Sequence, residues 1–304
     1  MRWGRRRNPS ARLATPDIAG VCLRASVFPK KMNLSPSRQS IRIRHTKCGL
    51  RDSMNWQYEE IRLSFRIGAK TLGQSRIKGM NCHAHISQLT PADARQPPEQ
   101  LMKSHKATLA RLATCPIEKP LPILSRAGRW YRYVPEHFPH FLTEIKGDFD
   151  AYLSRTFSRN ARKKFRRIIN RWSRRQGGEI RWREYRTLDE IREFLPLART
   201  VSEKTMQHRL LNRGITEGGR REAAILEEAR NGVARGYLLF DGDQPVVYNY
   251  GYLSPGGVMT LEYGGYDPAL RDWSIGTLLD YLVIQRAHDD PEIHMIDFGE
   301  GDGE

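Results

Sequence analysis

The stretch Asp267-Pro-Ala-Leu-Arg-Asp-Trp-Ser-Ile-Gly-Thr-Leu-Leu279 determines the fold that this sequence predicts, because it leads from a strand through a polar turn into an amphipathic helix. The small residues Ser274, Gly276 and Thr277 would leave successive backbone N–H groups uncovered at the start of that helix, where the helix dipole adds partial positive charge. Such a helix start can bind a pyrophosphate, and Arg271 could add a bidentate contact to a phosphate oxygen. The same residues are also compatible with an ordinary Ser N-cap and a Gly that permits tight packing.

The segments around this turn predict a mixed α/β domain. Three segments with strand-like alternation, 233–240, 245–253 and 258–266, are separated by Gly-rich turns and predict an antiparallel meander. Thr187 and Glu190 form a capping-box pattern at the start of a predicted helix. The other predicted elements are strands at 129–134, 179–185 and 293–298 and helices at 147–176, 187–204, 220–230 and 274–288.

Several classes of protein are excluded or disfavoured. No run approaches the roughly 18 to 20 apolar residues that a membrane span requires, so the sequence predicts no membrane span. The four cysteines of the 304-residue chain are far apart, which predicts reduced thiols, a cytoplasmic location and no cysteine-based metal site. The histidines form no metal-binding spacing, and the chain has neither G-x-G-x-x-G after a strand nor G-x-x-x-x-G-K-[ST].

Charge divides the chain into regions of opposite sign. Residues 1–101 hold 19 Lys and Arg against 6 acidic residues, and residues 154–186 hold 13 against 2. Residues 187–304 hold 11 against 21. The formal net charge of +17 is therefore a sum of opposites, which argues against a uniformly basic DNA-binding surface.

Residues 1–101 are predicted to be a basic and largely disordered region, because their periodicity is too brief to define a core. They could form a flexible arm, a targeting peptide, or a translated upstream stretch that is absent from the mature protein. The ordered domain is expected at 120–304. Its last strand ends in a Gly- and acid-rich hexapeptide, which predicts that the C-terminal end of the domain is missing.

The longest helical pattern, 147–176, has apolar residues at three- and four-residue steps and stops at Gly177-Gly178. Its opposite face is strongly basic. The cations of that face are Arg159, Arg162, Lys163, Lys164, Arg166, Arg167, Arg171, Arg174 and Arg175.

Three segments give the chain a resemblance to a known family: the basic helix Arg159–Arg167, the turn Tyr266-Asp-Pro to Gly276, and Ile296-Asp-Phe-Gly-Glu-Gly-Asp-Gly-Glu304. Arg271-x-x-Ser274-x-Gly276 is similar to the [RQ]-x-x-G-x-[GA] acyl-CoA pyrophosphate loop of GNAT acetyltransferases, with Ser in place of the first Gly. The three segments together resemble the cellulose-biosynthesis acetyltransferase-like subgroup, which is related to the FemAB aminoacyl transferases.

The resemblance implies a GNAT-like, mainly antiparallel sheet flanked by helices, and transfer of an acyl group from acetyl-CoA or another acyl-CoA to an amine or hydroxyl. The acceptor would be a sugar or a cell-envelope or polysaccharide precursor, and no metal is implied. The residues implied to bind the cofactor are Arg271, Trp273, Ser274, Ile275, Gly276, Thr277 and Leu278.

Attack of an amine on a thioester needs a base, and Glu262 is the only acid in the apolar strand 258–266. Alternation would place Thr260, Glu262, Gly264 and Tyr266 on one face, and partial burial would suit Glu262 to the role of general base. Glu262 could equally pair with an arginine or face solvent. Tyr250 is a second catalytic candidate, as proton donor or substrate contact, although most such tyrosines are packing residues.

Other functions remain open. The basic helix could be a solvated face that balances the acidic half, or could attract CoA phosphates, an acidic glycan, or tRNA through Arg159–Arg175. An aminoacyl-tRNA-dependent FemAB-type transferase and a non-enzymatic nucleic-acid-binding protein are therefore alternatives, and an inactive fragment is a third.

Overall fold

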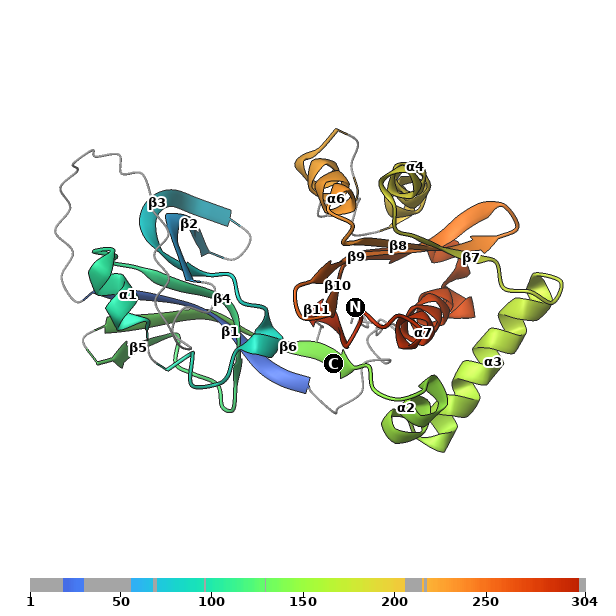
Figure 1. Ribbon diagram of the computed structural model, residues 1–304, viewed down its shortest axis with the longest axis horizontal. Coiled ribbons are helices and arrows are strands. Elements are labelled where there is room, and N and C mark those ends of the chain that lie inside the picture. The colour runs from blue at the N-terminus through green and yellow to red at the C-terminus, as the bar shows by residue number, and fades with distance from the viewer. Residues whose placement is uncertain are drawn as a thin grey trace, which may run out of the picture. The chain divides into compact units, whose positions relative to one another are not determined.

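The computed structural model of the chain describes residues 19–29, 56–67, 70–95, 97–128, 130–205, 215 and 218–300. The chain divides into two compact units, an N-terminal unit of Gly20–Pro139 and a C-terminal unit made chiefly of His140–Glu304. Each unit has its own buried core, so we describe them separately (Figure 1).

The N-terminal unit consists mainly of antiparallel strand pairs. Its elements are β1 (Ala19–Pro29), β2 (Trp56–Ile67), β3 (Lys70–Cys82), the 3-10 helix η3 (Ile86–Gln88), α1 (Glu99–Ser104), β4 (Ala110–Ile117), β5 (Leu124–Ala127) and β6 (Trp130–Glu144), whose last residues enter the C-terminal unit. β2 and β3 form a long hairpin, β4 pairs antiparallel with β1 and parallel with β3, and β5 pairs antiparallel with β6.

The prediction for residues 1–101 lies partly outside the described residues. For residues 56–101 the structure corrects it, because two long strands and two short helices are present there. Ile61 and Met80 are almost completely buried, and the fully buried Leu109 packs over Gly79, where a Cβ would come within 2.6 Å of the Leu109 carbonyl oxygen. The apolar partner thus comes from later in the chain, and short-range periodicity does not reveal it.

The C-terminal unit has the predicted mixed, antiparallel-rich sheet. The elements after β6 are α2 (Phe149–Thr156), α3 (Arg159–Arg175), β7 (Trp182–Tyr185), α4 (Leu188–Lys204), α6 (Arg220–Arg230), β8 (Ala234–Asp241), β9 (Gln244–Ser254), β10 (Val258–Tyr266), the 3-10 helix η4 (Pro268–Trp273), α7 (Ile275–His288) and β11 (Met295–Glu300). The strand order is β6-β11-β10-β9-β8-β7. The predicted meander is confirmed as β8, β9 and β10, and only β10 and β11 pair in parallel within this described part of the sheet.

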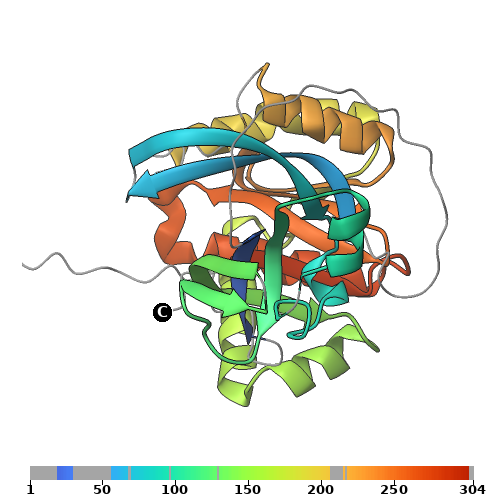
Figure 2. The same cartoon turned by 90° about the vertical axis from the view of Figure 1, so that its left-hand side faces the viewer.

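Helices cover both faces of this sheet, and Figures 1 and 2 show α4 and α6 on one side and α7 on the other. On the first face, Phe194 and Tyr250 belong to one buried cluster. On the second face, Trp172 of α3 and Met259 of β10 pack with the apolar side of α7. None of the helices in the described part of the chain combines the length and the apolar character needed to cross a membrane.

Helix boundaries follow local capping chemistry. The predicted helix 147–176 is two helices, because Phe157 is extended and the Ser158 hydroxyl accepts a hydrogen bond from the Ala161 amide at 3.3 Å, which starts α3. The predicted capping box of Thr187 and Glu190 is confirmed at the start of α4.

Candidate active site

Strands β10 and β11 stop pairing within a few residues. Their parallel ladder runs from Val258–Met295 to Thr260–Asp297, and no further pair joins these two described strands. Each strand then has a register irregularity, in β10 after Leu261 and in β11 before Gly299. A bulge bends its strand and interrupts pairing, so backbone groups of β10 beyond Thr260 are not engaged by β11. Such an edge can hydrogen-bond an extended ligand.

The N-terminus of α7 has an unusual cap. Ser274 adopts the left-handed conformation (φ 55°, ψ 38°), and its side chain makes no capping hydrogen bond. The Leu278 amide donates to the Ser274 carbonyl at 3.1 Å, so the amides of Ile275, Gly276 and Thr277 precede the first intrahelical bond. The left-handed conformation favours glycine, which is the residue that the resembling loop has at this position.

Gly276 is not required by packing. A Cβ placed there would meet only the Cδ1 of Tyr266, at an ordinary contact distance of 3.7 Å. The interpretation of Ser274 as a side-chain N-cap, with Gly276 chosen for tight packing, therefore does not hold. The space that a Cβ would occupy lies in the first turn of α7, beside the amides that have no intrahelical partner.

The other predicted cofactor residues can contribute in different ways. Ile275, Thr277 and Leu278 have buried side chains, so only their backbone groups are available to a ligand. Arg271 is exposed in η4. Trp273 is partly buried and lies under the guanidinium of Arg171, whose carbon is 4.0 Å from the centroid of the indole ring.

Glu262 is the extra residue of the β10 bulge, and this corrects the predicted strand faces. Thr260 pairs with Tyr252 of β9, and Tyr263 pairs with Tyr250, two residues away on the same face of β9. The bulge adds one residue between them, so Tyr263 shares a face with Thr260 rather than with Leu261. The side chain of Glu262 is exposed, so the partial burial expected for it is not found.

Tyr250 and Glu262 nevertheless belong to one polar cluster. The Tyr263 hydroxyl donates to Glu262 Oε1 at 2.9 Å, and the rings of Tyr250 and Tyr263 stack with centroids 6.3 Å apart. The Tyr250 hydroxyl donates to Glu228 Oε2 of α6. We call these four residues, Glu228, Tyr250, Glu262 and Tyr263, the Glu228 cluster.

The Glu228 cluster has perturbed proton affinities. Burial raises the pKa of the Glu228 carboxyl above its ordinary value, the hydrogen bond from Tyr250 opposes this, and the negative charge of Glu262 adds to it. Burial, then the Glu228 carboxylate, raises the pKa of Tyr250. Burial, then the charge of Glu262, raises the pKa of Tyr263 to about 12. Both phenols therefore stay protonated at neutral pH, and Glu228 is the carboxyl of this cluster whose pKa is raised.

A second carboxyl with a perturbed pKa lies on the other face of the sheet. Asn249 Nδ2 donates to Asp280 Oδ1 of α7 at 2.9 Å, and burial raises the pKa of Asp280 to about 7, although this hydrogen bond opposes the shift. Gly264 makes room for the amide, since a Cβ there would come within 2.6 Å of Asn249 Oδ1. Asp280 was not among the site residues predicted from the sequence. It is the single acid in the apolar helix α7, and that isolation is the sequence feature that could have identified it as a candidate site residue.

A buried His–Asp pair supports the end of the β10–β11 ladder. His140 Nε2 lies 2.7 Å from Asp297 Oδ1, and the same oxygen accepts a hydrogen bond from the Gly299 amide at 2.7 Å. Gly299 has a φ of 74°, a conformation that favours glycine. The Asp297 carboxylate therefore stabilises the irregularity in β11 between Asp297 and Gly299, directly after the last residue of β11 that pairs with β10.

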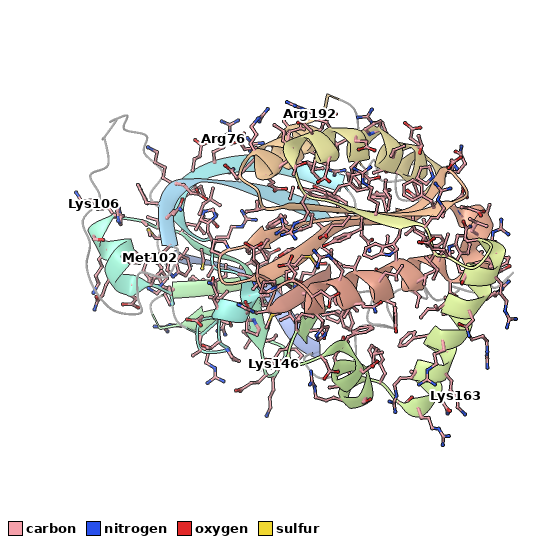
Figure 3. All side chains as sticks on the ribbon, turned by 45° about the vertical axis from the view of Figure 1, so that its right-hand side comes forward. Arg76, Met102, Lys106, Lys146, Lys163 and Arg192 are labelled. Carbon is pink, nitrogen blue, oxygen red and sulfur yellow. The ribbon has the colours of Figure 1, made fainter. Side chains whose placement is uncertain are left out.

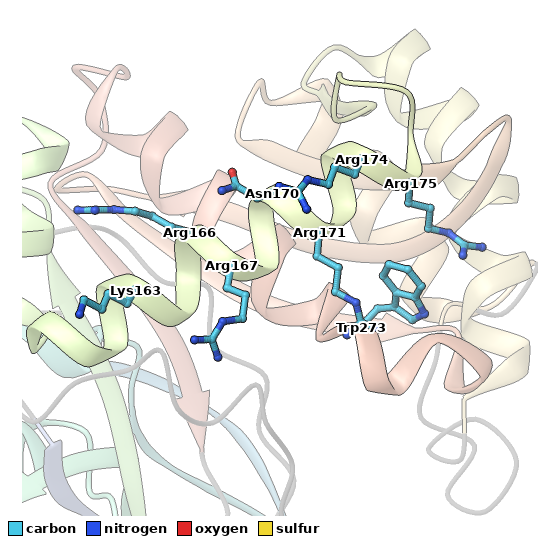
Figure 4. A pocket seen from close by; sticks show the side chains of 8 residues that line it. All are labelled: Lys163, Arg166, Arg167, Asn170, Arg171, Arg174, Arg175 and Trp273. Atoms are coloured by element: carbon cyan, nitrogen blue, oxygen red, sulfur yellow. The ribbon is translucent and has the colours of Figure 1, made fainter.

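An open groove of about 770 Å³ runs along α3 (Figure 4). We call it the α3 groove. Figure 3 shows the side chain of Lys163 projecting from α3. The residues that line the groove are Lys163, Arg166, Arg167, Asn170, Arg171, Arg174, Arg175 and Trp273.

Most cations on the basic face of α3 have no carboxylate partner among the described residues. Among the described residues, Arg175 alone of the α3 cations has a carboxylate partner, Asp241, with its Nη2 2.7 Å from Oδ2. Basic residues also follow one another at four-residue spacing from Arg159 to Arg175. Like charges at this spacing destabilise a helix by about 0.2–0.5 kcal/mol per pair. Charge balance by ion pairing within the described part of the domain therefore does not account for this face.

Residues 159–304 match the family model described as "Acetyltransferase (GNAT) domain". This match supports acyltransferase activity for the chain. A search of the curated proteins found no match. Among the described residues, no group of three or more His, Cys, Asp and Glu side chains could hold a metal ion.

Solved structures with similar regions include FemX, at 11% identity over 82% of this chain and 81% of that chain, with a TM-score of 0.44. Another is L-PGS from Bacillus licheniformis, at 17% identity over 53% and 46% of the two chains, with a TM-score of 0.38. A third is a GCN5-related N-acetyltransferase from Kribbella flavida, at 13% identity over 40% and 41%, with a TM-score of 0.26. The matched part is about half or less of the Bacillus and Kribbella proteins.

Proposed function

We propose that this chain is an acyl-CoA-dependent N- or O-acyltransferase in which an acceptor amine or hydroxyl attacks the thioester directly. The observation that carries the proposal is the start of α7. There, Ser274 is left-handed and the Cβ position of Gly276 is open, an arrangement that would let an anion approach the first amides of the helix. The family match over residues 159–304 supports the same reaction class.

The residues at this helix start fit an acyl-CoA. The amides of Ile275, Gly276 and Thr277 would hold the pyrophosphate, and the exposed Arg271 would add a charged contact. The backbone of β10 beyond Thr260 would align the pantetheine and acyl part as an added strand does at a sheet edge. Acyl-CoA, when bound, supplies the activated acyl group, which we propose to be acetyl.

The Glu228 cluster would handle the proton of the acceptor. An amine is protonated in water and must lose a proton before it attacks. Glu228, with its raised pKa, would accept that proton directly or through one water, while Tyr250 holds its carboxylate in place. The exposed Glu262 would attract and orient the acceptor. A sugar or a cell-envelope precursor is the acceptor that the resemblance implies, and direct transfer needs positioning rather than a covalent intermediate.

Isothermal titration of acetyl-CoA and of free CoA into the full chain tests the proposal. Wild type should bind both, and Gly276→Asp should abolish binding because it places a carboxylate at the pyrophosphate site. Gly276→Ala is the matched control, since its Cβ would make only an ordinary contact with Tyr266. Absence of binding by a wild-type chain that circular dichroism shows to be folded would refute the proposal.

The basic face of α3 favours a second candidate, an aminoacyl-tRNA-dependent transferase. That face lacks carboxylate partners apart from Asp241 among the described residues, as an RNA-binding surface would. This candidate predicts RNA binding that depends on the arginines between Arg159 and Arg175, together with no affinity for CoA.

A further inference from the structure

Four cations of the α3 groove have no ion-pair partner within the described part of the molecule. Lys163, Arg166, Arg167 and Arg174 are exposed and make no ion pair with any described carboxylate. At 1.5 Å rise per residue, the helix between Lys163 and Arg174 is about 16 Å long. One pyrophosphate cannot contact cations along that whole length, so the groove is larger than the phosphate site at the start of α7 requires.

The groove is joined to the start of α7 through η4. Arg171 Nη1 donates to the carbonyl oxygen of Asp272 at 3.0 Å, and its guanidinium lies over the ring of Trp273. The guanidinium carbon of Arg175 lies 4.8 Å from the centroid of the same ring. Figure 4 shows the side chains of Arg171, Arg175 and Trp273 together at this end of the groove. Trp273 is followed directly by Ser274, the cap of α7. A long ligand whose phosphate is bound at the first turn of α7 would therefore extend past η4 into the α3 groove.

The chemistry of the lining points to phosphate. Arginine presents two parallel N–H donors to a phosphate, and such charge-assisted pairs are stronger than neutral hydrogen bonds. The α3 helix has no acidic residue, so its row of like charges repels itself unless an anion is bound. The combination of open groove, arginine lining and continuity with α7 fits a phosphorylated ribose attached to the rest of the donor.

We propose that the α3 groove binds the phosphorylated ribose of the acyl donor, an inference that rests on the proposed function. Two donors carry this chemistry, CoA with its ribose 3′-phosphate and an RNA 3′ end with its phosphodiesters. The α3 groove would thus contribute to the affinity for the donor. The start of α7 would bind the pyrophosphate, and the Glu228 cluster would take part in acyl transfer.

Titration of four probes into the full chain separates the possibilities: CoA, 3′-dephospho-CoA, adenosine 3′,5′-bisphosphate and a single-stranded oligoribonucleotide. The groove variant is Arg167→Gln/Arg174→Gln. The control is Arg159→Gln/Lys164→Gln, which removes the same charge from exposed positions of the same helix that do not line the groove. Loss of two charge-assisted contacts should weaken bisphosphate and CoA binding by at least about tenfold in the groove variant and by less than about twofold in the control.

The outcomes test the groove assignment and the proposed acyl-CoA function separately. Tighter binding of CoA than of dephospho-CoA, lost in the groove variant alone, would support the CoA form of the proposal. If CoA and dephospho-CoA bind equally and the groove variant behaves as wild type, while Gly276→Asp abolishes binding, the groove assignment is overturned and the proposed function stands. RNA binding lost only in the groove variant, without CoA binding, would support the groove with RNA as donor and overturn the acyl-CoA function. No binding of any probe would overturn both.

Discussion

The hydroxyl of Tyr250 donates a hydrogen bond to the carboxylate of Glu228, and this contact ties the central strand β9 to α6 at the face opposite α7. It places a carboxyl of raised pKa beside a phenol that remains protonated.

Glu228→Gln should remove a proton acceptor that works only when ionised. Because the pKa of Glu228 is raised, wild-type kcat/KM should rise as pH increases through that raised value and fall below it. The glutamine variant should lose about 10²- to 10⁴-fold in kcat and should lack this acid limb. Glu262→Gln is the comparison and should mainly raise KM for the acceptor. A variant profile that keeps the wild-type acid limb would exclude Glu228 as the base.

Tyr250→Phe should shift that limb rather than abolish it. The hydrogen bond from Tyr250 lowers the pKa of Glu228, so its removal should move the limb to higher pH. Loss of the bond should also reduce the free energy of unfolding by about 1 kcal/mol. The pH–rate profile and urea unfolding measure the two effects, and a limb that moves to lower pH would contradict the assignment.

Gly251→Ala and Gly276→Ala should differ strongly in stability. A Cβ at Gly251 would come within 2.2 Å of the Thr260 carbonyl oxygen beside the β10 bulge, whereas one at Gly276 would lie 3.7 Å from Tyr266. We expect Gly251→Ala to lower the free energy of unfolding by about 1–3 kcal/mol, the usual range for overpacking. Gly276→Ala should change it little. Urea denaturation of both proteins tests this, and equal stabilities would argue against the bulge geometry.

Asp280→Asn should change how stability depends on pH. The pKa of Asp280 is raised to about 7, so the folded protein holds a proton that the unfolded chain releases at much lower pH. Between pH 4 and 7, wild type should therefore lose stability from this group as pH rises. The asparagine variant has no such loss, so relative to wild type it should be more stable at pH 8 than at pH 4, by at least the 1.4 kcal/mol or so of one pKa unit. A pH-independent difference in Tm would contradict the shift.

Arg167→Glu should stabilise α3 and impair the groove. The new carboxylate lies four residues from both Lys163 and Arg171 and replaces two repulsive pairs by attractive ones. The gain in the free energy of unfolding should be roughly 0.5–1 kcal/mol, and it should shrink in high salt. Thermal melts at two ionic strengths measure it. A lower Tm at low salt would show that Arg167 has a stabilising partner.

Local patterns predicted the elements whose signals are short-range. The capping box at Thr187, the meander and the helix after Ser274 were all identified, because caps, turns and periodicity act within a few residues. The break between α2 and α3 was missed, since Ser158 lies within a continuous apolar repeat and only its hydrogen bond to Ala161 shows where α3 begins.

The candidate site was only partly predictable, because its geometry depends on pairing between distant segments. The bulge at Glu262 is set by the register with β9, and no residue of β10 alone announces it. Glu228 is one of several acids on α6 and becomes distinct only through its contact with Tyr250. The burial of Ile61 and Met80 likewise depends on residues that come much later in the chain.

The pairing of β11 with β6 has a consequence for folding order. His140 and Asp297 are 157 positions apart in sequence, whereas the hairpins of the meander close over a few residues. Closing a long loop costs more chain entropy than closing a short one, so the meander should form early and β11 should insert between β10 and β6 late. We therefore expect the binding of the proposed donor to recover later than far-UV circular dichroism during refolding, because β11 and the neighbouring end of β10 would be the last part of this unit to form.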